Sequence, residues 1–133
     1  MLNLQRILKK RSDMKTEIGE FLLVLMHSST NAQILHRQSR SYSEHKALGY
    51  YYRNVIPLVD DLIEAIQGLE EEIIEYPVDY YSPSETGLEE IQSLKDFVKD
   101  ERKSLPQNTE IQNIVDEIAK LIDGTLYRLK FLK

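Results

Sequence analysis

The sequence predicts an all-α fold: a four-helix bundle of two antiparallel hairpins joined by a long crossover loop. Three observations lead to this prediction. Apolar residues recur three or four positions apart along almost all of the 133 residues, no segment alternates with the period of two typical of a strand, and one stretch rich in proline and tyrosine interrupts the pattern. With 41% apolar residues, residues 1–133 are expected to form a single domain around one core.

The first predicted helix covers residues 13–38, and residues 1–12 form a short arm before it. Ser12 is the expected N-cap, because a serine side chain can accept a hydrogen bond from the first free backbone N–H groups of a helix. One face of this helix is apolar and leads directly into His36. Its members are Ile18, Leu22, Leu25 and Ala32.

The second predicted helix covers residues 44–75, with an earlier end near Gly68 as the alternative, and it follows a serine-rich break at residues 39–43. Ser43 is its expected N-cap. Pro57 lies inside this helix and predicts a kink there, because proline removes one backbone hydrogen bond and crowds the preceding turn.

The stretch YPVDYYSPSETG, residues 76–87, is predicted to be the crossover loop. Two more helices follow it, at residues 88–104 and, after the N-cap Thr109, at residues 109–132. Twelve extended residues reach roughly 40 Å, which is enough to travel the length of a bundle of long helices. Two hairpins joined in this way form the ferritin-like arrangement of a four-helix bundle.

Composition argues against several classes of partner and site. A net charge of −5 disfavours binding to nucleic acid or to an anionic membrane, and the one local basic cluster is Lys9, Lys10, Arg11 and Lys15. The absence of cysteine excludes disulfides, zinc–thiolate sites and iron–sulfur clusters. The longest apolar run, residues 21–26, is too short to span a membrane. We therefore expect a cytoplasmic protein.

The candidate site combines histidine with two carboxylates. Asp60 and Glu64 follow His45 by 15 and 19 positions, and because the acids are one helical turn apart they project from one face. Imidazole nitrogen together with carboxylate oxygen suits iron, manganese or zinc. The alternative interpretation is the ordinary solvated edge of an acidic helix.

The three histidines, His27, His36 and His45, all lie in the first two predicted helices. A di-iron centre inside a bundle uses Glu-x-x-His motifs, and the sequence contains none. His45 lies roughly 22 to 29 Å along its helix from the acids, a distance that one subunit can hardly bridge. Two subunits related by a twofold axis can bridge it, so we expect a site of this kind at a homo-oligomer interface. For His27 we expect a hydrogen-bonded histidine at an interface or on the surface rather than a metal ligand.

Residues 35–68, LHRQSRSYSEHKALGYYYRNVIPLVDDLIEAIQG, resemble the core segment of the Dps family, ferritin-like starvation proteins that sequester iron in hollow dodecamers. In that family a histidine ending the first helix, a histidine opening the second, and a following Asp-x-x-x-Glu form a ferroxidase site shared between two subunits. The resemblance implies that His36 and His45 come from one subunit and Asp60 and Glu64 from its twofold partner. It also implies that iron is oxidised there by peroxide or dioxygen and then sequestered.

Part of the same segment, SYSEHKALGYYY, is also similar to uncharacterised tailed-phage proteins with ferritin-like helices. This similarity supports a second hypothesis, a metal-free bundle that serves a phage as a scaffold or partner-binding protein without catalysis. A viral protein would act in the host cytoplasm or in the virion. Metal binding distinguishes the two hypotheses.

Overall fold

The computed structural model describes the backbone of residues 4–133 and the side chains of residues 15–133, and its regular structure in that range is entirely helical. The predicted all-α fold is confirmed. The helices are α1 Leu4–Gln38, α2 Tyr42–Glu70, α3 Gly87–Glu101 with a short 3₁₀ turn, η1, at Arg102–Ser104, and α4 Thr109–Phe131.

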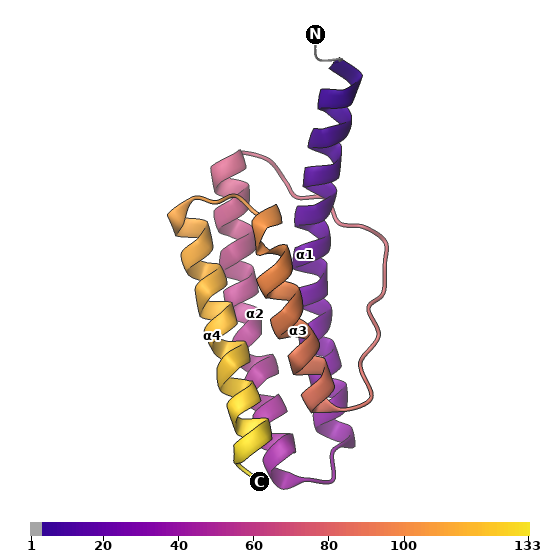
Figure 1. The fold of residues 1–133 in the computed structure, drawn as a ribbon, viewed down its shortest axis with the longest axis vertical. Helices are drawn as coiled ribbons and strands as arrows, with labels where there is room; N and C mark the ends of the chain where they lie inside the picture. The colour runs from indigo at the N-terminus through magenta and orange to yellow at the C-terminus, as the bar shows by residue number, and fades with distance from the viewer. Residues whose placement is uncertain (1–3) are drawn as a thin grey trace.

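The helices form two antiparallel hairpins, α1–α2 and α3–α4 (Figure 1). Residues 71–86 connect the hairpins along the outside of the bundle, so that α3 starts at the end where α2 also starts. Helix α1 packs against α2 and α3, and α4 packs against the same two helices. The first turns of α1 project beyond the other three helices.

One apolar core runs through the bundle, and all four helices contribute to it. Tyr51 and Phe21 are its largest fully buried side chains, and the Phe21 ring stacks on that of Phe97 with centroids 5.4 Å apart. Each fully buried leucine, isoleucine or valine stabilises the fold by about 1.5–3 kcal/mol. The other large side chains that are fully buried are Leu22, Leu25, Leu48, Leu62, Ile66, Ile91, Ile111, Ile118, Ile122 and Val55.

The structure corrects the predicted N-termini. Helix α1 begins at Leu4 and passes through Ser12, so residues 4–12 are not an arm and Ser12 is not an N-cap. This part of the sequence holds good helix formers without glycine or proline, and nothing there stops a helix. The remainder of the predicted arm, residues 1–3, lies outside the described residues, as do the side chains of three members of the basic cluster, Lys9, Lys10 and Arg11.

Helix α2 is capped by Ser41 rather than Ser43, because the Ser41 side chain accepts a hydrogen bond from Glu44 N at 3.3 Å. The helix runs through Pro57 and ends at Glu70, five residues before residue 75 and two residues after Gly68, the alternative end. Glu71 adopts a left-handed conformation with φ 53°. Consecutive acids at this C-terminus oppose the helix dipole, which favours an early end.

The caps of the second hairpin are close to their predicted positions. Asn108 is the N-cap of α4, and Thr109, the predicted cap, is its first helical residue. Thr86 caps α3, since its hydroxyl oxygen accepts a hydrogen bond from Glu89 N at 3.1 Å.

Polar contacts fasten the crossover to α1. Tyr81 donates its backbone N–H to His27 Nδ1 at 3.2 Å, and Asn31 Nδ2 donates to Tyr81 O at 2.9 Å. His27 thus has the hydrogen-bonded role expected from the sequence. The crossover backbone also crosses α1 at Gly19, where a Cβ atom would lie 2.1 Å from Glu75 O. Only glycine permits this approach.

Candidate functional site

His36 and His45 lie together at the closed end of the α1–α2 hairpin. Their rings stack with centroids 3.6 Å apart and planes 17° apart. His36 Nδ1 is 2.5 Å from His45 O, and His45 Nδ1 is 2.8 Å from His36 O. The two residues therefore join the end of α1 to the start of α2 by reciprocal hydrogen bonds.

These bonds fix which ring nitrogen can bind a ligand. A backbone carbonyl oxygen can only accept, so each Nδ1 carries a proton and donates it. In the neutral ring the lone pair then lies on Nε2. A histidine held through Nδ1–H to a carbonyl is the usual arrangement of a metal-binding imidazole, because that bond fixes both tautomer and ring orientation.

The surroundings of the two rings differ. His36 is 8% exposed and packs edge-on against Tyr52 with centroids 5.4 Å apart, whereas His45 is only partly buried. Gly49 makes room for the His36 ring, since a Cβ atom there would lie 3.0 Å from His36 Cε1 and 3.2 Å from an Arg53 guanidinium nitrogen. His45 is consequently the ring more accessible to a ligand.

The structure does not bring the acids to the histidines within one subunit. Asp60 and Glu64 are exposed on α2, one turn apart and on the far side of Pro57 from His45. Among the side chains of residues 15–133, no three His, Cys, Asp or Glu residues are grouped so that they could hold a metal ion. His36 and His45 form one half of the predicted constellation, and Asp60 and Glu64 form the other.

The stack also limits how metal can bind. An imidazole ligand meets its ion in the plane of the ring, and the two ring planes are nearly parallel and separated. One ion in the plane of His45 is therefore well outside the plane of His36. In these rotamers each ring can bind a separate ion through Nε2, whereas binding one shared ion requires one of the two rings to rotate.

A second polar cluster, inside the bundle, was not found by sequence reasoning. Glu90 is 6% exposed and accepts a hydrogen bond from Ser84 N at 3.2 Å; burial raises the pKa of its carboxyl. Tyr51 lies nearby with its hydroxyl 2.7 Å from Ser28 Oγ, and burial raises the pKa of this phenol as well. An acid in the first turn of a helix is ordinary, so nothing in the sequence signals the burial of Glu90.

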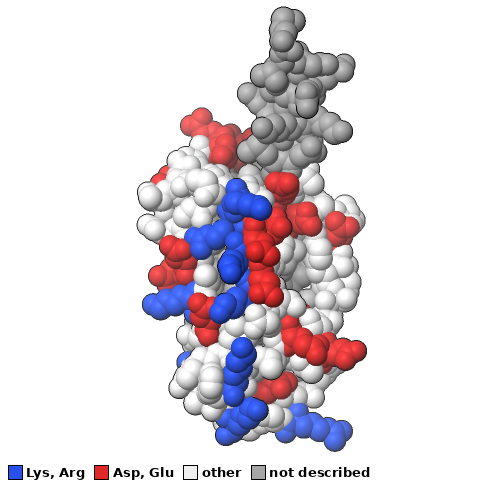
Figure 2. Space-filling model, viewed as in Figure 1, with Lys and Arg blue, Asp and Glu red and all other residues white. Residues whose placement is uncertain are grey.

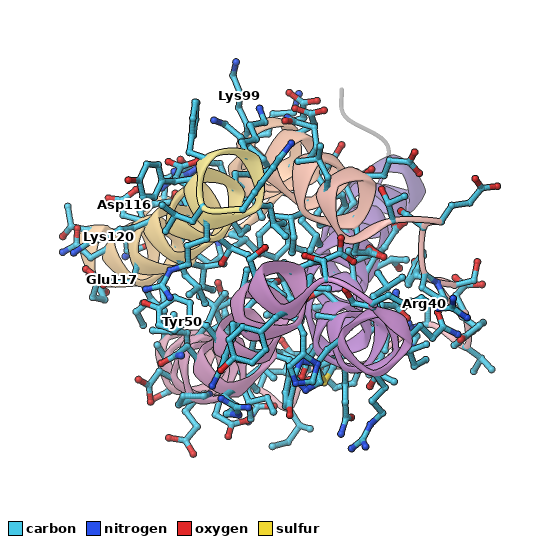
Figure 3. The ribbon with its side chains drawn as sticks, turned by 90° about the horizontal axis from the view of Figure 1, so that it is seen from below. Arg40, Tyr50, Lys99, Asp116, Glu117 and Lys120 are labelled. Carbon is cyan, nitrogen blue, oxygen red and sulfur yellow. The ribbon has the colours of Figure 1, made fainter. Side chains whose placement is uncertain are left out.

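The outer face of α2 exposes apolar side chains next to the acids. Ile56 is 48% exposed, one turn before Asp60, and Pro57 beside it is exposed as well. Tyr50 lies on the α4 side of α2 (Figure 3). The Cζ atom of Arg128 is 4.0 Å from the centroid of the Tyr50 ring. Helix α2 thus exposes both apolar and charged groups along its length.

Comparisons with known proteins assign the chain to a family whose function is unknown. The model of a family of unknown function, DUF5856, matches residues 36–129, a span that begins at His36 and includes all of α2, α3 and the crossover. Neither the curated proteins nor the solved structures include a match. Within residues 4–133, no helix combines the length and hydropathy needed to cross a membrane.

Proposed function

Because the chain belongs to the DUF5856 family, whose function is unknown, we propose its function from the site: a ferritin-like, Dps-like bundle that binds and oxidises iron between two subunits. His36 and His45 of one subunit would face Asp60 and Glu64 of the partner subunit. The observation that carries the proposal is the reciprocal histidine pair. It leaves Nε2 of two adjacent rings free of a backbone hydrogen bond, and Asp60 and Glu64, further along α2, are exposed to a partner subunit.

A twofold interface along α2 supplies the missing contact. When two α2 helices pack antiparallel with the twofold axis near Arg53, His45 comes opposite Asp60 and Glu64 of the partner subunit. Ile56 lies within one turn of that axis, and its exposed side chain would be buried there. The exposure of Asp60 and Glu64 within one subunit is then a requirement of the site.

The residues suit iron as a substrate. Neutral imidazoles bind Fe²⁺ through Nε2, and the hard carboxylate oxygens of Asp60 and Glu64 favour Fe³⁺. The stack of two rings favours a pair of ions over one, since each ring meets its own ion. Peroxide or dioxygen is the oxidant, and the ferric product would be sequestered by the oligomer.

The test is an anaerobic titration of Fe²⁺ into the metal-free protein, with light scattering on the same sample. Peroxide is then added, and the absorbance of the ferric product is followed. We expect saturable binding to an oligomer and fast oxidation, both lost in the double variant Asp60→Asn with Glu64→Gln. The matched control is Asp61→Asn, which removes an exposed acid from the neighbouring position of α2. Equal binding by all three proteins would contradict the proposal.

A second candidate, a metal-free scaffold or partner-binding protein of a phage, is favoured by one observation. The histidine pair already has a structural role, because its two hydrogen bonds and its stack close the α1–α2 hairpin without any ion. Under this alternative the titration gives no binding above background. Replacing the histidines would then lower stability without any metal-dependent effect.

A further inference from the structure

An open pocket lies at the end of the bundle where α2 terminates. Its volume is 410 Å³, and we call it the end pocket. Four isoleucines form its apolar part, and charged side chains of α1, α2 and the start of the crossover complete it. The lining residues are Lys15, Ile18, Ile66, Glu70, Glu72, Ile73, Ile74 and Glu75.

The end pocket is acidic at its rim and incompletely covered. Among the lining side chains of residues 15–133, three are acids, Glu70, Glu72 and Glu75, and one is a base, Lys15, whose Nζ is 2.5 Å from Glu72 Oε1. The Ile73 side chain is 78% exposed, a costly position for a large aliphatic group. The pocket therefore fits an occupant that is both apolar and basic.

The opposite end of the molecule carries such a group. Near the end of α4, Tyr127 is 56%, Phe131 72% and Leu132 49% exposed, and Lys130 and Lys133 are exposed beside them. We call these five residues the α4 tip. Figure 2 shows Lys and Arg side chains at this lower end of the molecule, and on the same face both signs of charge are mixed through its middle and upper part.

We propose that the α4 tip of one copy docks into the end pocket of a second copy. Phe131 and Leu132 would cover the isoleucines of the pocket, and Lys130 and Lys133 would face the acidic rim. Because the two surfaces lie at opposite ends of one chain, the contact is head-to-tail. Such a contact extends into a row or closes into a ring, and it needs neither the twofold interface nor metal.

Charge reversal at either surface tests the proposal by sedimentation velocity over a range of concentrations. In Lys130→Glu with Lys133→Glu, the α4 tip becomes acidic like the described lining of the end pocket, and in Glu70→Lys with Glu75→Lys the pocket lining gains the basic charge of the tip. We expect head-to-tail association to weaken about tenfold or more in each variant. The matched control is Lys99→Glu with Lys120→Glu, which changes the same charge on exposed positions of α3 and α4.

Mixing the two reversed variants is the decisive step. Each α4 tip then meets a pocket of opposite charge on the other variant, so an alternating head-to-tail assembly re-forms only in the mixture. An interface that pairs one surface with itself would give no more than dimers in the mixture, whereas the head-to-tail contact gives longer assemblies.

A neutral variant tests the apolar part of the contact. Phe131→Ser with Leu132→Ser should weaken association at least about tenfold, with an unchanged helical circular-dichroism spectrum. Three results would overturn the proposal: a wild-type protein that does not extend beyond a twofold dimer at any concentration, reversal variants that associate like the control, or a mixture that stays dissociated. If the end pocket instead binds a basic, apolar segment of a different protein, the purified wild-type protein will not extend beyond a twofold dimer.

Discussion

Glu90 is the residue on which burial and charge conflict most directly. Its side chain is 6% exposed, and among residues 15–133 its neighbour Asn31 has a buried Oδ1 without a hydrogen-bond partner. Burial raises the pKa of Glu90, while the hydrogen bonds from Ser84 and Asn31 oppose that effect. The fold therefore favours the uncharged form of Glu90 more than the unfolded chain does.

The sign of the pH dependence follows from this raised pKa. The stability that Glu90 contributes is present at low pH, where the carboxyl is protonated in both states, and is lost as the pH rises through the pKa of the folded protein. Glu90→Gln stays uncharged, and its amide oxygen can still accept from Ser84 N. We predict that Glu90→Gln increases the free energy of unfolding at neutral pH and that the gain shrinks in mild acid.

Urea unfolding from mildly acidic to neutral pH measures this difference. The control is Glu89→Gln, one position earlier in α3 and exposed, for which we expect no pH-dependent gain. If Glu90→Gln is destabilised equally at every pH, the hydrogen bonds to the Glu90 carboxylate fully offset the cost of its burial, which contradicts the prediction.

The sequence predicted that His36 and His45 lie at one end of a hairpin, but it did not predict how the two rings contact each other. His36 and His45 flank one helix break, so their closeness follows from the hairpin. Their reciprocal hydrogen bonds depend on ring orientation, which Gly49 and Tyr52 set from a turn or two further along α2. No local pattern contains that information.

At the scale of the element, the sequence predicted the interiors of the helices and the start of α4, but not the start of α1 or the cap of α2. The 3.6-residue period predicted the apolar face of α1, and Leu22, Leu25 and Ala32 of that face are buried, because an apolar stripe must face the core wherever the helix starts. The end of α2 depends instead on acids crowded at its C-terminus and on the left-handed Glu71. Each of these local effects changes the free energy of the helix end by less than about 1 kcal/mol, and the spacing of apolar residues does not reveal them.

Glycines within α2 allow a test of the packing around His36. Gly49→Ala adds a Cβ atom 3.0 Å from the buried ring, so we predict a loss of about 1–2 kcal/mol in the free energy of unfolding. Gly68→Ala meets nothing within 4 Å, and we predict a gain of about 0.5–1 kcal/mol from helix propensity. Urea unfolding compares the two. An equal gain in both variants would show that the ring is free to move.

The crossover allows the same comparison on α1. A Cβ atom at position 19 would overlap Glu75 O, which is backbone, so Gly19→Ala must displace the start of the crossover. We predict a loss of about 1–3 kcal/mol and faster amide hydrogen exchange over residues 72–78. Gly124→Ala, which meets nothing within 4 Å in α4, is the control. Unchanged exchange over the crossover would contradict this role of Gly19.

At the scale of the whole molecule, connectivity followed from loop length. A proline-rich stretch long enough to run along the bundle predicted two hairpins joined by a crossover, and residues 71–86 take that course. The contacts between subunits could not be predicted in the same way, because they depend on which side chains are exposed, and the spacing of apolar residues does not give this. The exposure of Asp60, Glu64 and Ile56 is instead what a twofold contact along α2 requires.

Subunit complementation tests the shared site most directly. One variant carries His36→Ala and His45→Ala, and the other carries Asp60→Asn and Glu64→Gln. Neither should bind Fe²⁺ alone. After dissociation and random re-association of an equal mixture, a mixed dimer contains one intact site, so we predict about a quarter of the wild-type binding stoichiometry. A mixture that binds no Fe²⁺ while the wild-type protein does would contradict a site shared between subunits.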